Sequence, residues 1–298
     1  MTRTHLHWAE KLTVQFAAAA GLAMVYFLAG PALRGVDPQS ATAFLATGRY
    51  VEAAVLAVMV LVLSAACALL TLPSRPEGAL LAALIAAGGI SARSPQFRTL
   101  LWRQSDGLGG LYAGLIAEVV VLTAVLLAAY AVISLVRRVM AGAWSGIVWK
   151  PSQPAQGGPP GGRQQRRTDK KPDHPAKSLG GMGLALAMGM ALVLVFLQSG
   201  DRGQVIFALV AGLALAVMAA DRLCPVSHSG YFLLMPMAAA VLFYLLGWVS
   251  SAGASAGNWT AVPLYARVLP IDWLTAGCGG ASLGYWISQR ATESRQFE

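Results

Sequence analysis

Charged residues are scarce in this chain of 298 residues, since Asp, Glu, Lys and Arg make up 12% of it, against about 25% in soluble domains. Hydrophobic residues make up 56%. This composition excludes an ordinary water-soluble globule. It also excludes disorder of the whole chain, which requires low hydrophobicity together with high charge. What remains is an integral membrane protein that crosses the bilayer several times.

Cysteine and histidine are also rare, with three and four copies. Three cysteines cannot form a disulfide framework, and no Cys-x-x-Cys pair occurs. No histidine lies within an apolar run, which argues against membrane haem ligation and His-rich di-iron chemistry. The HExxH and Walker A motifs are absent from the sequence as well. We therefore expect no cofactor and assign no catalytic residue, and the sequence favours a non-enzymatic role.

Long apolar runs recur along the whole chain. A bilayer core about 30 Å thick is crossed by roughly 20 apolar residues of α-helix. The runs predict an all-α bundle of about eight transmembrane helices, and tryptophans such as Trp273 flank them, as expected at a membrane interface. The run 78–92 is short and contains Gly88-Gly89, so it is either a short span or a re-entrant hairpin. The eight runs are 12–33, 53–72, 78–92, 111–136, 178–200, 203–220, 231–249 and 273–289.

Basic charge is concentrated in one segment. Residues 137–178 hold nine Lys and Arg against two Asp, which accounts for +7 of the net charge of +9 and argues against nucleic-acid binding. Residues 150–178 contain six prolines and no large apolar side chain, so burial cannot offset the entropy of ordering them. We expect a disordered basic linker between two membrane halves of four spans each, residues 1–149 and 179–298.

The distribution of basic residues also predicts an orientation. With all eight runs crossing the bilayer, the side that holds the linker carries 15 Lys and Arg and the other side carries seven. The positive-inside rule then places the linker and both termini in the cytoplasm, and we expect the membrane to be a bacterial cytoplasmic membrane. Residues 139–149 fit an interfacial helix, and the linker after them is suited to anionic lipid headgroups.

Glu118 lies well inside a predicted span, where a charged group is costly and therefore a candidate functional residue. One reading is a carboxylate that binds a proton or an ion in a transport pathway. The other is a neutral Glu in an interhelical hydrogen bond, which we favour because the spans hold no second carboxylate or Lys to accompany it. Small residues that allow close helix contact are Gly110 and Gly114 on the same face, and Gly280 and Gly284 in the last run.

Asp221, Cys224 and His228 cluster after the sixth run, and their side chains are of the types that bind Zn²⁺. The signal is weak, because Pro225 interrupts the helix between Cys224 and His228 and no fourth ligand is evident. We expect no metal here. Residues 280–284 also match the G-x-S-x-G pattern of serine hydrolases, but a membrane helix is the wrong context for that motif.

Three functional classes fit these observations. The first is a non-catalytic subunit or assembly component of a membrane complex, with the bilayer and other membrane subunits as partners. The second is a transporter of a small molecule, an ion or a lipid, and the third is an intramembrane enzyme. Because transporters carry more ionisable and helix-breaking features at mid-membrane than Glu118, Pro236 and Gly88-Gly89, we favour the first class.

Overall fold

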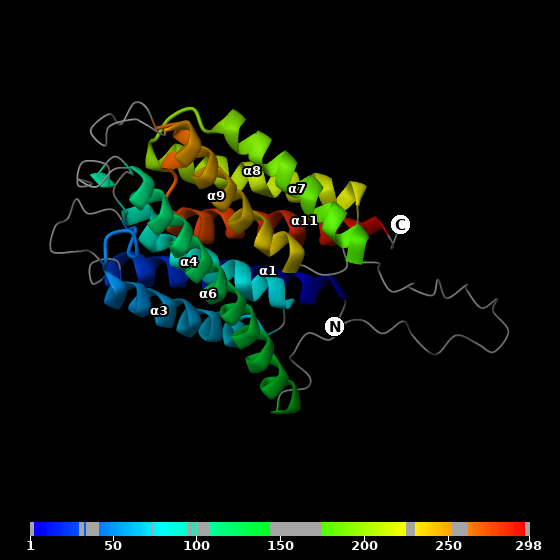
Figure 1. Ribbon diagram of the computed structural model, residues 1–298. Helices are drawn as coiled ribbons and strands as arrows, with labels where there is room; N and C mark the ends of the chain where they lie inside the picture. The colour runs from blue at the N-terminus through cyan, green and yellow to red at the C-terminus, as the bar shows by residue number, and fades with distance from the viewer. Residues whose placement is uncertain are drawn as a thin grey trace.

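The computed structural model describes residues 3–29, 33, 42–72, 74–94, 97, 99–100, 108–143, 175–224, 230–251 and 262–295. As the sequence predicts, the regular secondary structure of these residues is helical. Consecutive long helices run in opposite directions, and the two ends of the chain lie near the same end of the bundle (Figure 1). The elements are α1 (Arg3–Met24), the π-helical turn η1 (Val25–Ala29), α3 (Tyr50–Leu70), α4 (Pro76–Arg93), α6 (Leu108–Ala143), α7 (Pro175–Phe196), α8 (Arg202–Leu223), α9 (Gly230–Ser250), the 3-10 turn η3 (Leu264–Arg267), α10 (Pro270–Asp272), the π-helical turn η4 (Trp273–Gly277) and α11 (Cys278–Arg295).

Six of these helices are long and apolar enough to cross a membrane. Their outward faces carry large exposed side chains such as Phe16, Val62 and Val195, which suits contact with lipid tails. The structure therefore supports a multi-pass membrane protein, while the count of eight spans and the division into four plus four stay predictions. The six candidate spans are Lys11–Ala29, Tyr50–Leu70, Leu108–Ala143, Ser178–Phe196, Arg202–Leu223 and Gly230–Ser250.

The two remaining long helices, α4 and α11, occupy the interior of the bundle. They pack against each other, α4 also contacts α1 and α3, and α11 also contacts α8 and α9. Twelve residues of α4 are buried, and every residue from 268 to 282 is buried as well. A helix shielded by other helices meets little lipid, so it can be less apolar than a helix that faces the bilayer.

The doubtful run 78–92 forms one continuous helix. Pro76 occupies the first turn of α4 after Arg75, whose backbone is extended. Proline suits this position because its missing N–H would have no partner there. Glu77 in the first turn and Arg93 in the last turn complement the helix dipole. The helix is unbroken at Gly88-Gly89, which excludes the re-entrant hairpin.

The boundaries around the predicted linker differ from the expectation. Helix α6 continues to Ala143, so residues 139–143 extend α6 and do not begin a separate interfacial helix. Helix α7 begins at Pro175, so residues 175–178 belong to a helix and not to the linker. Residues 144–174 lie outside the described residues. The disorder of the linker, its contacts with headgroups and the domain division therefore stay predictions.

Trp273, expected to present its ring at a membrane interface, instead lies inside the bundle. Its side chain is completely buried in η4, and its ring centroid lies 5.7 Å from that of Phe243 on α9. The Trp signal fails here because an indole ring fits a tightly packed helix core as well as it fits a headgroup region.

Candidate functional site

Glu118 faces a backbone turn, not a side chain of another helix. It lies on α6 and is 2% exposed, and its Oε2 accepts a 3.0 Å hydrogen bond from the N–H of Leu45. The N–H groups of Phe44 and Ala46 also interact with the carboxylate. Backbone N–H groups that face a carboxylate favour its negative charge. The turn therefore forms a cradle of backbone N–H groups beside the carboxylate of Glu118.

The segment 42–49, which supplies the cradle, is a tight turn before α3. Gly48 has a φ of +73°, a left-handed conformation that glycine adopts without strain. The Gly48 N–H donates to the carbonyl of Leu45 at 3.1 Å, and the Arg49 N–H donates to that of Phe44 at 2.7 Å. The Thr47 hydroxyl donates to the Ala43 carbonyl at 2.6 Å. These local bonds hold the N–H groups of residues 44–46 in one orientation.

Gly114 is the residue of α6 against which the turn 42–49 packs. A Cβ atom at Gly114 would lie 2.9 Å from the Cα of Ala46, which is too close for any other residue without a shift. Gly114 lies four residues before Glu118, so the two positions lie one above the other on one helix face. The turn thus rests on Gly114 and is bonded to Glu118. Gly110, one turn earlier, is exposed.

Side chains tie the segment 42–49 to its surroundings. The hydroxyls of Thr42 and Ser94 share a 2.5 Å hydrogen bond, which links the segment to the end of α4. Arg49 donates to the carbonyl of Leu33 at 3.0 Å and forms a 3.0 Å ion pair with Glu52. The segment is therefore anchored on α4 and on α6.

A second buried carboxylate belongs to Asp272, whose side chain has no exposed surface. Arg202 at the start of α8 donates from Nη1 to Oδ2 and from Nη2 to Oδ1, both at 2.7 Å. The Ser91 hydroxyl donates to Oδ1 at 2.6 Å, and the Leu269 N–H donates to Oδ2 at 3.2 Å. Each oxygen of Asp272 thus accepts two hydrogen bonds, and the network joins α4, α8 and α10.

The sequence reasoning missed this network. Asp272 and its partner Arg202 adjoin the predicted runs 273–289 and 203–220, and they place a second buried carboxylate in the bundle besides Glu118. Tyr244, completely buried on α9, interacts electrostatically with both Glu118 and Asp272. A signal was present in Pro270 followed by Asp272, because Pro and then an acid are typical of a helix start.

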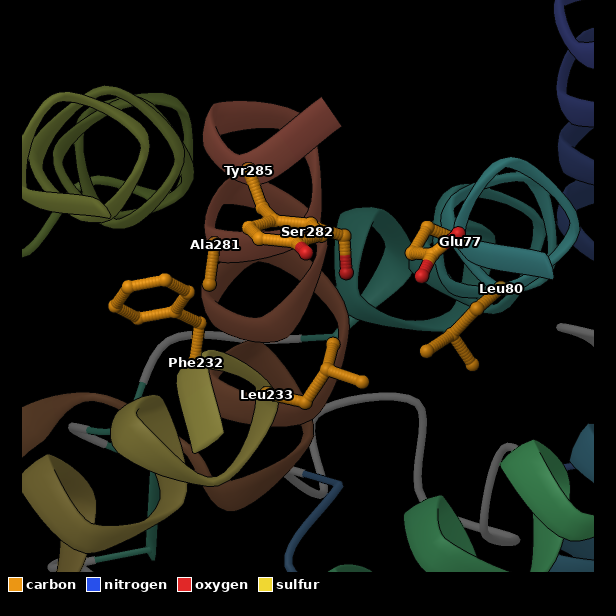
Figure 2. Close-up of a pocket in the computed structure, with 7 residues that line it drawn as sticks. All are labelled: Glu77, Leu80, Phe232, Leu233, Ala281, Ser282 and Tyr285. Atoms are coloured by element: carbon orange, nitrogen blue, oxygen red, sulfur yellow. The ribbon is translucent and has the colours of Figure 1, made fainter. Parts of the chain in front are cut away.

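A small pocket lies elsewhere in the bundle, among α4, α9 and α11. Figure 2 shows that the Glu77 carboxylate, the Ser282 hydroxyl and the Tyr285 ring border it, and it has room for about one water molecule. The Ser282 hydroxyl donates to the Cys278 carbonyl at 2.7 Å inside α11. Ser282 therefore lacks the strand-to-helix elbow of a G-x-S-x-G nucleophile. The pocket is lined by Glu77, Leu80, Phe232, Leu233, Ala281, Ser282 and Tyr285.

Asp221, Cys224 and His228, the weak candidates for zinc binding, have different surroundings. Asp221 is buried near the end of α8, and its Oδ2 accepts a 2.6 Å hydrogen bond from the Ser288 hydroxyl of α11. Gln289 donates to the same oxygen at 3.4 Å. Cys224 is exposed, and His228 lies outside the described residues. Asp221 is thus engaged with α11, and the structure does not place all three candidate ligands.

Gly280 and Gly284 face α8. A Cβ atom at Gly280 would lie 2.7 Å from the carbonyl oxygen of Val210, and one at Gly284 would overlap the backbone of Ala214. The structure thus places both glycines where the two helix backbones come closest. Such contact is the usual reason for small residues at four-residue spacing in membrane helices.

Comparisons with known proteins add no further identification, since no family model, no curated protein and no solved structure matches this chain.

Proposed function

We propose that this protein is a non-catalytic subunit or assembly component of a membrane complex. The observation that carries the proposal is the saturation of Asp272, whose two oxygens accept four hydrogen bonds from this chain. A carboxylate bound in this way joins helices and has little capacity left for a substrate. Glu118 likewise binds the chain's own backbone. Asp272 and the Oε2 atom of Glu118 therefore support the bundle itself, and we expect the contacts with partners on its surface.

The proposal includes a position in the membrane. We propose a bacterial cytoplasmic membrane, with the linker and both termini in the cytoplasm and the basic linker near anionic headgroups. Two observations support this orientation. The excess of Lys and Arg lies on the linker side of the eight-span arrangement, and both ends of the chain lie near one end of the bundle (Figure 1).

The test is purification in a mild detergent followed by mass spectrometry of everything that remains bound. We expect one or more membrane proteins in a fixed ratio to this chain. Purification of the chain alone from its native membrane, at a yield that matches its abundance there, would contradict the proposal. A bound small molecule without a protein partner would favour the transport alternative.

Substitutions on the lipid-facing surface then show which helix face binds the partner protein. Ala20 on α1, Ala131 on α6 and Ala187 on α7 are exposed small residues on three helices. Each is replaced by Trp, and the three variants serve as controls for one another. If a partner helix docks on one of these faces, that variant loses the partner, while the other two keep it and all three unfold at the same temperature.

The second candidate is transport, and one contact favours it. Pro236 interrupts the hydrogen-bond ladder of α9, and η4 contains a π-helical turn. These irregularities meet, because a Cβ atom at Gly277 would lie 3.3 Å from the Cβ of Pro236. Irregular helices that meet inside a bundle are typical of transporter sites, and π-helical turns are frequent at functional sites.

A further inference from the structure

We propose that Glu118 is a proton-sensitive latch, which holds the segment 42–49 tightly on the bundle while its carboxylate is ionised and loosens the segment when it takes up a proton. This inference goes beyond the role in a complex and does not depend on it. It rests on the geometry of the carboxylate, the turn and the charges around them.

The cradle is built for a negative charge. The Leu45 N–H donates to Oε2, and the N–H groups of Phe44 and Ala46 interact with the same carboxylate. Hydrogen bonds to an ionised acceptor are about twice as strong as those to a neutral one. Protonation therefore removes a large part of the attraction between α6 and the turn.

Within the described residues, no cation is paired with Glu118. Arg49, which lies in the turn segment, is paired with Glu52 and donates to the carbonyl of Leu33. Asp272 on α10 is neutralised by Arg202. Tyr244 on α9 can also titrate, and it interacts electrostatically with Glu118. Among the residues that the structure describes, the charge of Glu118 is thus opposed by backbone dipoles, and proton uptake is the direct way to neutralise it.

The second oxygen of Glu118 offers a place for that proton. Oε1 is buried and makes no hydrogen bond of normal geometry to the described residues. A proton on Oε1 leaves Oε2 free to accept the Leu45 N–H, but without the charge. The protonated state therefore loosens the turn and does not reverse the contact.

Helix α4 connects the segment 42–49 with the hydrogen-bond network of Asp272. Thr42 is bonded to Ser94, and Ser91, three residues earlier in the chain, is bonded to Asp272. Protonation of Glu118 therefore also affects the end of α4, where Ser91 connects this helix to α8 and α10.

A single new cysteine tests the latch. Ala43 has no exposed surface, whereas the natural Cys224 is exposed and Cys67 and Cys278 are buried. In the Ala43→Cys variant, Cys224 serves as an internal reference for the effect of pH on thiol chemistry. The measurement is the rate at which a maleimide labels position 43, divided by the rate at Cys224, in detergent between about pH 8 and about pH 5. We expect the ratio to rise about tenfold as the pH falls.

Two further variants make the result decisive. In Glu118→Gln, the neutral amide mimics the protonated acid, so the ratio should be high throughout and should not change with pH. In Glu52→Gln, an acid in the same region is removed, and the labelling ratio should still rise as the pH falls. A ratio that stays constant with pH in the chain that keeps Glu118, or a rise that survives Glu118→Gln, would overturn the latch. If Glu118→Gln fails to fold, a ratio that stays constant with pH in the chain that keeps Glu118 still overturns the latch.

Discussion

Ser91 and Asp272 are separated by 181 positions in the chain, and the hydroxyl of the first donates a 2.6 Å hydrogen bond to the carboxylate of the second. Arg202 completes the contact by binding both oxygens of Asp272. Three helices that are distant in sequence thus meet at one saturated carboxylate. This joint offers the most direct test of what holds the bundle together.

Replacing Asp272 with Asn should destabilise the protein strongly. The amide cannot accept a bidentate bond from Arg202, and the partly buried guanidinium loses its ionic partner. Removal of one member of a buried ion pair costs about 3 kcal/mol or more. Ser91→Ala should cost less, about 2 kcal/mol, because one hydrogen bond to the charged carboxylate is lost. Thermal unfolding in detergent measures both effects.

Asp201→Asn is the matched control for this prediction. Asp201 adjoins Arg202 in the chain but is exposed, and its carboxylate is paired with the Ser199 hydroxyl at 3.1 Å. Its replacement should change the stability by less than about 0.5 kcal/mol. Equal losses for Asp272→Asn and Asp201→Asn would show that the buried pair has no special role.

A methyl group added at Gly284 should force α11 away from α8. Its Cβ would overlap the backbone of Ala214, which cannot move aside as a flexible side chain can. Overpacking of this kind costs about 1–3 kcal/mol. Gly88→Ala is the control, because a Cβ there has no neighbour within 4 Å. The control should be neutral or slightly stabilising in the same unfolding assay, and a neutral Gly284→Ala would contradict the close helix contact.

Arg137 should matter far more than the adjacent Arg138. Arg137 is 8% exposed and donates from Nη2 to the carbonyls of Leu72 and Ser74, just beyond the end of α3. Arg138 is exposed. Arg137→Met leaves these carbonyls without the cation and should cost about 2 kcal/mol. Arg138→Met should stay within about 0.5 kcal/mol, and comparable losses for the two would argue against this contact as a stabilising element.

Reporter fusions test the orientation. One reporter is inserted at Gly158 and another is fused after Glu298, with a reporter active only in the cytoplasm and one active only outside it. We expect both positions to report the cytoplasm, because the excess of Lys and Arg lies on that side. A fusion that reports the other side would show that a run does not cross the membrane, and residues 78–92 would be examined first.

The sequence predicts the apolar helices well because each is encoded locally. A run such as 231–249 needs no distant partner to be recognised, and α9 spans Gly230–Ser250. The run 78–92 is short and less apolar, because the interior position of α4 relaxes the need for apolar residues. Glu118 was identified because a charge inside an apolar run is conspicuous.

The partners of these residues could not be predicted in the same way. Ser91, Arg202 and Asp272 each lie near the end of a different run, where polar residues are ordinary. Nothing in one sequence states that these ends meet in space. The turn that binds Glu118 contributes backbone N–H groups, which every residue except proline carries, so the turn leaves no compositional trace.

The interior position of α4 and α11 has a consequence for how the protein enters the membrane during synthesis. Neither helix is among the strongly apolar ones, so each gains less than its neighbours from partitioning alone into lipid. Both follow in the chain the helices that shield them, since α1 and α3 precede α4, and α8 and α9 precede α11. In the eight-span arrangement, the order of translation thus supplies a protein surface for each weak helix before that helix leaves the ribosome.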